Sequence, residues 1–180
     1  MHTRFMRLIP ICLAGAALAV VGLASAAAQT RLVISGAFHT TSARTLDGHD
    51  EACGFRTKAR TLVYESDAMR IGRGKAVARV ELFIPHFRGR GRYDARTPAP
   101  YGRTAVQVVT GRNATTGIGV FYIATSGGVT VVQTTNVGHL GQSGSVSGTV
   151  HTKLHLQRGT KRLRLDGRWR CRINPMSNGG

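Results

Sequence analysis

Arginine is the residue type whose number and spacing in this sequence most clearly indicate chemistry. Over residues 162–172 it alternates with apolar residues or glycine, and an acid replaces it only at Asp166. Because successive side chains of a strand point to opposite faces, these arginines would form one row with a repeat of about 6–7 Å. Guanidinium groups held at this repeat can bind phosphates or carboxylates in bidentate fashion. We call this row the arginine ladder: Arg162, Arg164, Arg168, Arg170 and Arg172.

A second basic segment interleaves aromatic residues with arginines separated by glycine, over residues 86–93. Aromatic rings that stack on bases or sugars, together with arginines on phosphates, would suit single-stranded nucleic acid or an acidic glycan. We therefore predict that Arg88, Arg90, Arg92 and Tyr93 bind polyanions. The alternative for this segment is a glycine-rich turn between two strands. For the ladder, the alternative is a solvated strand face whose charge prevents aggregation.

Motifs for catalysis are sparse. The glycine-rich stretch 111–117 lacks the Lys-Ser/Thr pair of a phosphate-binding loop, and no G-x-S-x-G elbow is present. Paired carboxylates for glycoside cleavage would have to come from the acidic residues at 47–51 or from distant pairs such as Glu65 and Glu81. We predict no catalytic residue, and a hydrolase built on a β-sandwich is the least supported hypothesis.

Metal-ligand patterns are equally weak, and we predict neither a metal nor a cofactor. His151 and His155 share a strand face, but on an extended strand they lie about 13 Å apart, too far to hold one metal. The acidic cluster Asp47, Asp50 and Glu51 lacks the ligand pattern of a calcium loop. An acid-rich turn leading into Cys53 accounts for it.

The composition sets the class of protein. The 180 residues include 25 Lys+Arg against 8 Asp+Glu, a formal net charge of +17, and 42% are hydrophobic. This apolar content argues against a disordered basic tail, and the length suits one domain. The sequence has neither a Gly-x-y period nor sustained heptads, so it is neither collagen nor a coiled coil.

Residues 1–28 have the pattern of a secretory signal peptide. Arg4 and Arg7 precede an apolar run over residues 8–23, and small residues follow at 24–28. The alternative is an uncleaved anchor, but this run is shorter than the roughly 20 residues that span a bilayer. We therefore expect an exported protein, periplasmic or extracellular, that keeps no transmembrane anchor after cleavage. Residues 29–180 would form a single domain.

Cleavage would leave two cysteines, Cys53 and Cys171. In an oxidising compartment we predict that they form one structural disulfide. A catalytic dithiol would favour C-x-x-C spacing, and a zinc site would need two more cysteines or histidines nearby.

The dominant hydrophobic period in residues 29–180 is two, which is typical of strands. Turn-forming groups rich in glycine separate the strand-like segments at the spacing of a sandwich or barrel. We predict an all-β fold, a single antiparallel β-sandwich or small barrel of about eight strands. The predicted strands are 31–40, 57–65, 76–84, 104–110, 118–125, 129–135, 145–156 and 161–173.

The last two predicted strands suggest their own register. If Gln157 pairs with Thr160 across the turn, Leu154 faces Leu163, and apolar residues meet apolar ones along the whole hairpin. Trp169 then faces Gly148, which leaves room for the indole ring. A slip of two residues would also keep the faces, so alternation determines the parity and not the exact pairing. Asp166-Gly167 is also a hairpin signal, but the unbroken alternation favours one long strand.

These observations favour a non-catalytic binding module for extracellular polyanions such as nucleic acid, acidic glycan or envelope polymer. The alternative is a structural protein without a small ligand, whose charge keeps it soluble or attaches it loosely to an anionic envelope surface.

Overall fold

The computed structural model describes residues 30–43, 51–56, 58–73, 76–95, 103–111, 119–139 and 142–174. Within these ranges the chain forms strands and no α-helix, so none of the described residues belongs to a helix able to cross a membrane. The strands are β1 (Arg31–Gly36), β2 (Thr40–Ala43), β3 (Glu51–Arg56), β4 (Thr61–Glu65), β5 (Met69–Arg70), β6 (Val77–Ile84), β7 (Gly91–Asp94), β8 (Ala105–Thr110), β9 (Val120–Thr135), β10 (Gly144–Leu156) and β11 (Arg162–Ile173).

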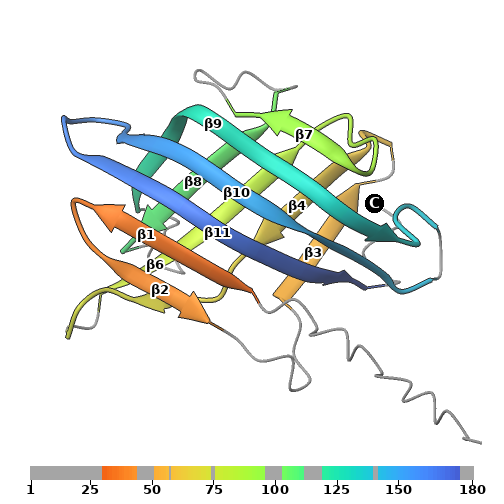
Figure 1. The fold of residues 1–180 in the computed structure, drawn as a ribbon, viewed down its shortest axis with the longest axis horizontal. Helices are drawn as coiled ribbons and strands as arrows, with labels where there is room; N and C mark the ends of the chain where they lie inside the picture. The colour runs from red at the N-terminus through yellow and green to blue at the C-terminus, as the bar shows by residue number, and fades with distance from the viewer. Residues whose placement is uncertain are drawn as a thin grey trace, which may run out of the picture.

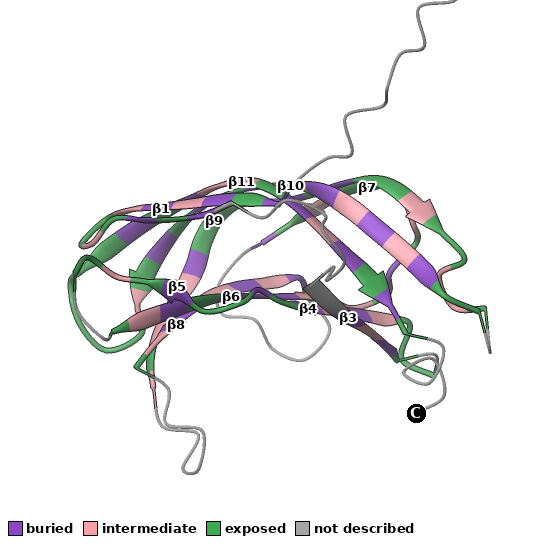
Figure 2. Ribbon diagram, turned by 90° about the horizontal axis from the view of Figure 1, so that it is seen from below, coloured by how far each residue is buried: buried purple, intermediate pink, exposed green. Residues whose placement is uncertain are grey.

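The strands lie in two layers. One contains β1, β7, β9, β10 and β11, and the other contains β3, β4, β5, β6 and β8 (Figures 1 and 2). Hydrogen-bonded pairing runs continuously through β3, β4, β6, β8, β9, β10 and β11 and back to β3. The all-β class and the antiparallel sheet are confirmed, with one parallel pairing, β3 with β11.

The two long strands β9 and β11 join the layers. One edge of each pairs with β10. The other edge of β9 pairs with β8 over residues 120–123 and with β7 over residues 128–131. In the same way, β11 pairs with β1 over residues 163–168 and with β3 over residues 171–173. Each strand therefore has a partner in both layers.

The β10–β11 hairpin has the predicted register. Leu154 pairs with Leu163 and Gly148 with Trp169, and β11 runs unbroken through Gly167. A Cβ on Gly148 would meet the Thr130 carbonyl oxygen and would lie 3.2 Å from Trp169 Nε1, so glycine is needed at this position. The apolar face of the hairpin is part of the core, where Trp169 packs on Tyr64 with ring centroids 5.3 Å apart.

The predicted disulfide between Cys53 and Cys171 is present. It joins β3 to β11, with the two Cα atoms 5.6 Å apart, and both residues are buried. The bridge thus fastens the parallel pairing, where the two layers meet.

Some predicted strands have different boundaries. Of the predicted strand 57–65, residues 61–65 form β4, and residues 58–60 are the turn that joins β4 to β3 in a hairpin. Predicted strands 118–125 and 129–135 are one strand, β9. Their separation was predicted from Gly127 and Gly128, but a Cβ on either would meet a backbone carbonyl of the adjacent strand. These glycines permit close approach of neighbouring strands rather than a turn.

Four short strands, β2, β3, β5 and β7, bring the number in the described residues to eleven rather than about eight. Strand β2 begins at Thr40, the last residue of the predicted strand 31–40, and continues to Ala43. The predicted signal peptide, together with Asp47 and Asp50, lies outside the described residues.

Candidate polyanion-binding surface

The arginine ladder lies on the outer face of β11. The intervening side chains of Leu163, Leu165, Trp169 and Cys171 are buried in the core, so alternation turns the arginines outward. Arg170 is half-buried, and the other four are exposed. The predicted face of the ladder is confirmed.

Neighbouring strands extend this surface on both sides of β11. Residues paired across an antiparallel sheet point to the same face, so the register defines lateral rows. One row runs from Arg31 through Arg168, Thr149 and Thr130 to Arg92. We call the outer face of β1, β11, β10, β9 and β7 the basic face.

Arg92 therefore shares a surface with the ladder. Three strand intervals separate β7 from β11, which corresponds to about 14 Å at the usual strand spacing. A second basic row, four residues before Arg168 on β11, pairs Arg164 with Lys153. Arg92 of the second basic segment thus belongs to the same basic patch as the ladder.

Asp166 is the acid within the ladder, and it is held by two partners. Its Oδ1 lies 2.9 Å from His151 Nδ1 and accepts a hydrogen bond from Arg164 Nη2 at 3.3 Å, while its Oδ2 accepts one from Arg164 Nε. Partial burial would raise the pKa of the carboxyl, but the bonds and charges of Arg164 and His151 outweigh it and hold the pKa of Asp166 below its ordinary value. The same hydrogen bond raises the pKa of Arg164.

The second acid of the basic face lies in the same lateral row. Asp94 and Asp166 are joined through Gly128 and His151, and Asp94 accepts a hydrogen bond from Arg92 Nε at 3.1 Å. Basic side chains occupy the rows on both sides of this acidic row. Each carboxylate hydrogen-bonds an arginine of a neighbouring basic row, Asp94 with Arg92 and Asp166 with Arg164.

Charge is unequal between the two layers. The outward positions of the strands on the basic face carry eight basic side chains and two carboxylates: Arg31, Arg92, Lys153, Arg162, Arg164, Arg168, Arg170 and Arg172 against Asp94 and Asp166. The described outward positions of the opposite layer carry three basic side chains and two carboxylates: Arg56, Arg70 and Arg79 against Glu65 and Glu81.

The aromatic rings of the second basic segment point away from the basic face. Phe87 is 2% exposed and stacks on Tyr93, with ring centroids 5.8 Å apart. The Tyr93 hydroxyl donates to the Gly89 carbonyl oxygen at 2.7 Å and accepts from the Arg88 amide at 3.0 Å. These contacts support the loop, and a ring as buried as Phe87 cannot stack on a ligand. Arg88 and Arg90 are exposed.

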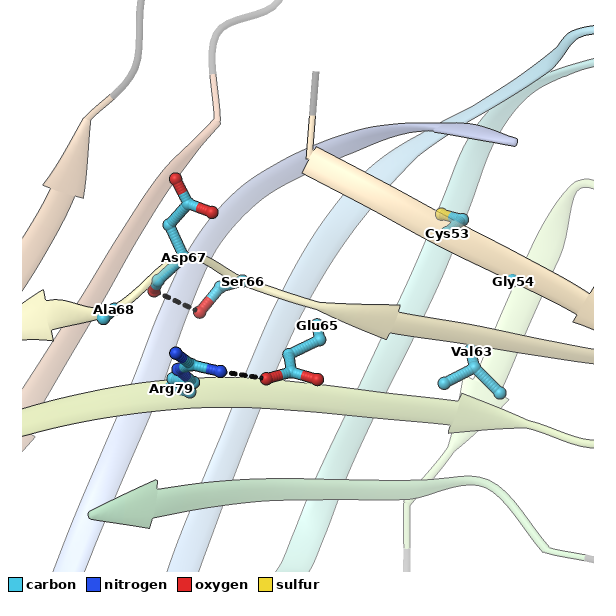
Figure 3. A pocket seen from close by; sticks show the side chains of 8 residues that line it. All are labelled: Cys53, Gly54, Val63, Glu65, Ser66, Asp67, Ala68 and Arg79. Carbon is cyan, nitrogen blue, oxygen red and sulfur yellow. Dashed lines mark hydrogen bonds and ion pairs between the residues drawn. The ribbon is translucent and has the colours of Figure 1, made fainter. Parts of the chain in front are cut away.

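The opposite layer holds a carboxylate-lined cavity of about 420 Å³ (Figure 3). Its charged residues are Glu65, Asp67 and Arg79, and Arg79 Nη1 donates to Glu65 Oε1 at 2.7 Å. Glu81 is the cross-strand partner of Glu65, so the fold brings together the carboxylates that are distant in sequence. Glu81 accepts a hydrogen bond from the Gln107 amide.

Among the residues that the structure describes, no three His, Cys, Asp or Glu side chains lie close enough together to hold a metal ion. His151 and His155 both lie on the outer side of β10, where His151 Nδ1 contacts Asp166 Oδ1.

Sequence reasoning missed Arg31 as part of the surface. Its pairing partner Arg168 is distant in the sequence, and an isolated arginine before a short apolar segment carries no local signal. No protein-family model, curated protein or solved structure matches this chain, so a functional proposal depends on the geometry of its surfaces.

Proposed function

We propose that this protein is an exported, non-catalytic module that binds extracellular polyanions through its basic face. The observation that carries the proposal is the lateral row from Arg31 and Arg168 to Arg92, which places Arg92 of the second basic segment on the same surface as the ladder. Fixed cationic side chains on a sheet can contact several phosphates, sulfates or carboxylates of one polymer at once.

The rigid sheet supports this proposal. The positions of the arginine Cα atoms are set by backbone pairing, so less conformational entropy is lost on binding than with arginines on a flexible tail. The arginine head groups present donors in a planar fork that matches oxyanions. The nearly balanced charge of the opposite layer favours binding in one orientation.

Export is supported by two features. The basic and apolar pattern of residues 1–28 is that of a signal peptide, and the disulfide between Cys53 and Cys171 belongs to an oxidising compartment. We propose a periplasmic or extracellular location on this basis.

The experiment measures retention of the oxidised protein, purified after expression of the full chain, on heparin and single-stranded DNA across a salt series. The test variant replaces Arg162, Arg164, Arg168 and Arg170 by Ala. The matched control replaces four exposed arginines away from the basic face, Arg56, Arg70, Arg73 and Arg103, by Ala. We expect the ladder variant to elute at much lower salt than the control. For single-stranded DNA, the salt slope should fall by about 0.7 per lost phosphate contact.

Equal losses in the two variants would contradict the proposal. Retention would then reflect only bulk charge, as in an unrelated basic protein of similar net charge, and the envelope-associated structural role would be favoured. In that case, salt should release the protein from cells, because only screened charge would hold it there.

A further inference from the structure

A second cavity, of about 430 Å³, lies where the β3–β4 turn, the 85–90 connection and the end of β9 meet. Its charged and polar lining comes from Arg60, Arg88, Thr134, Asn136 and His139. None of the described residues that line it is acidic. Its volume lies in the usual range of small-molecule sites, and the positive charge of its lining suits an anionic group.

The Arg60 guanidinium is positioned by the backbone. Its Nε and Nη2 both donate to the Phe87 carbonyl oxygen, at 3.3 and 3.1 Å, and the Phe87 amide donates to the Arg60 carbonyl oxygen at 2.7 Å. These bonds use two of the five N–H donors of the guanidinium. The β3–β4 turn and the 85–90 connection are thereby held together.

The second arginine of the cavity is held by its backbone. The Arg88 amide donates to the Tyr93 hydroxyl, and the Tyr93 ring stacks on Phe87. Phe87 in turn meets Phe55 edge to face, with ring centroids 6.1 Å apart. The apolar rings beneath the two arginines exclude water from one side of the cavity, which strengthens hydrogen bonds between the guanidinium groups and an anion.

Backbone strain is concentrated around the same cavity. In the described part of the chain, the non-glycine residues with positive φ are Arg60 at 45°, His86 at 50° and Asn136 at 48°. Arg60 and Asn136 line the cavity, and His86 directly precedes Phe87. Strained residues of this kind tend to occur at ligand-binding sites, where the surrounding structure holds them in place.

We propose that this cavity binds one oxyanion, a carboxylate or phosphate, between Arg60 and Arg88. This inference goes beyond the proposed function, because the cavity is separate from the ladder and would bind a single anionic group rather than a polymer backbone. The anion could be a free small molecule or the terminal group of a longer chain, since both present the same oxyanion.

The test is a titration of the oxidised protein with inorganic phosphate and with D-glucuronate, followed by calorimetry and by NMR of the arginine Nε–H groups. The test variants are Arg60→Gln and Arg88→Gln. The matched control is Lys58→Gln, which removes one positive charge from the same β3–β4 turn without lining the cavity. Because loss of the Arg60 contacts can disturb folding, Arg88→Gln is the decisive variant.

We expect saturable binding with one site per chain, weakened about tenfold or more in Arg88→Gln and unchanged in Lys58→Gln. Absence of saturation with both anions, or equal affinity in Arg88→Gln and the wild type, would overturn the proposal.

An oligonucleotide with and without a terminal phosphate distinguishes the two sources of the anion. Binding that depends on the terminal phosphate identifies the end of a longer chain, and binding that does not depend on it identifies a free anion. The ladder variant should retain phosphate binding, which separates this test from that of the basic face.

Discussion

Asp166 is the carboxylate that partly neutralises the positive charge of the arginine ladder. It pairs with Arg164 and His151 and so removes part of the positive potential from the middle of the ladder. The predicted register, in which Leu154 faces Leu163, also places His151 opposite Asp166, and the structure has this pairing. The added contact with Arg164, two residues away on the same strand face, depends on side-chain conformation.

Replacement of Asp166 by Asn should strengthen polyanion binding. It removes a negative charge from the basic face and frees the Arg164 guanidinium to contact a ligand, so elution from heparin should shift to higher salt. Asp67→Asn is the matched control, because it removes an exposed carboxylate from the opposite layer. Similar shifts in the two variants would mean that the position of the charge is unimportant.

The same substitution should change how stability depends on pH. The pKa of Asp166 is lowered in the folded protein, so its ion pairs stabilise the fold above about pH 4, the ordinary pKa of aspartate, and this contribution disappears as pH falls through the lower folded pKa. Asp166→Asn should therefore lower the free energy of unfolding by less than about 1 kcal/mol at neutral pH. Urea unfolding across the acid range should show that the difference vanishes at low pH, and a constant difference would contradict this account.

At the scale of elements, β10 and β11 form the part of the fold that positions the ladder. Their register depends on a tight turn and on a glycine opposite the single tryptophan. The disulfide then fastens the end of β11 to β3.

Gly148→Ala should destabilise the protein by about 1–3 kcal/mol, the usual effect of overpacking a core. Its Cβ would meet the Thr130 carbonyl oxygen and the Trp169 ring. Gly54→Ala in β3 is the matched control, because a Cβ there meets nothing within 4 Å. Urea denaturation monitored by tryptophan fluorescence compares the two, and equal stability would show that β9 and β11 readily move apart.

Reduction of the disulfide should lower the free energy of unfolding by about 5 kcal/mol in the chain-entropy model, because the bridge closes a long loop with a sequence separation of 118. The measurement is urea denaturation with and without reductant. A variant with both Cys53 and Cys171 replaced by Ala should show no response to reductant. If reductant also left the urea midpoint of the wild type unchanged, the pairing of β3 with β11 would hold without the bridge.

At the scale of the whole molecule, the distribution of charge between the layers matters more than the net charge. Basic side chains crowd the outer face of one layer, where they repel one another, and the opposite layer is nearly balanced. Such a distribution favours association with anionic polymers but lowers the stability of the folded state through self-repulsion.

Moderate salt should therefore stabilise the wild-type protein. Raising the ionic strength from about 0.01 M to about 0.15 M shortens the Debye length from about 30 Å to about 8 Å, which screens repulsion between the arginines. The thermal midpoint should rise with sodium chloride in the wild type and less in the ladder variant. The four-arginine control from the opposite layer should respond like the wild type, and a response as small as that of the ladder variant would contradict local repulsion.

The sequence by itself determined the all-β class, the pairing of Cys53 with Cys171 and the parity of the β10–β11 hairpin, and the turn between Gln157 and Thr160 suggested the register that the structure has. These features follow from local alternation, turn residues and the presence of two candidate cysteines. Tertiary structure decided that Arg31 and Arg92 join the ladder on one face, that Phe87 turns inward, and that Arg60 and Arg88 line one cavity. The reason is physical: alternation sets which face a side chain occupies, but pairing between distant strands determines which side chains share that face.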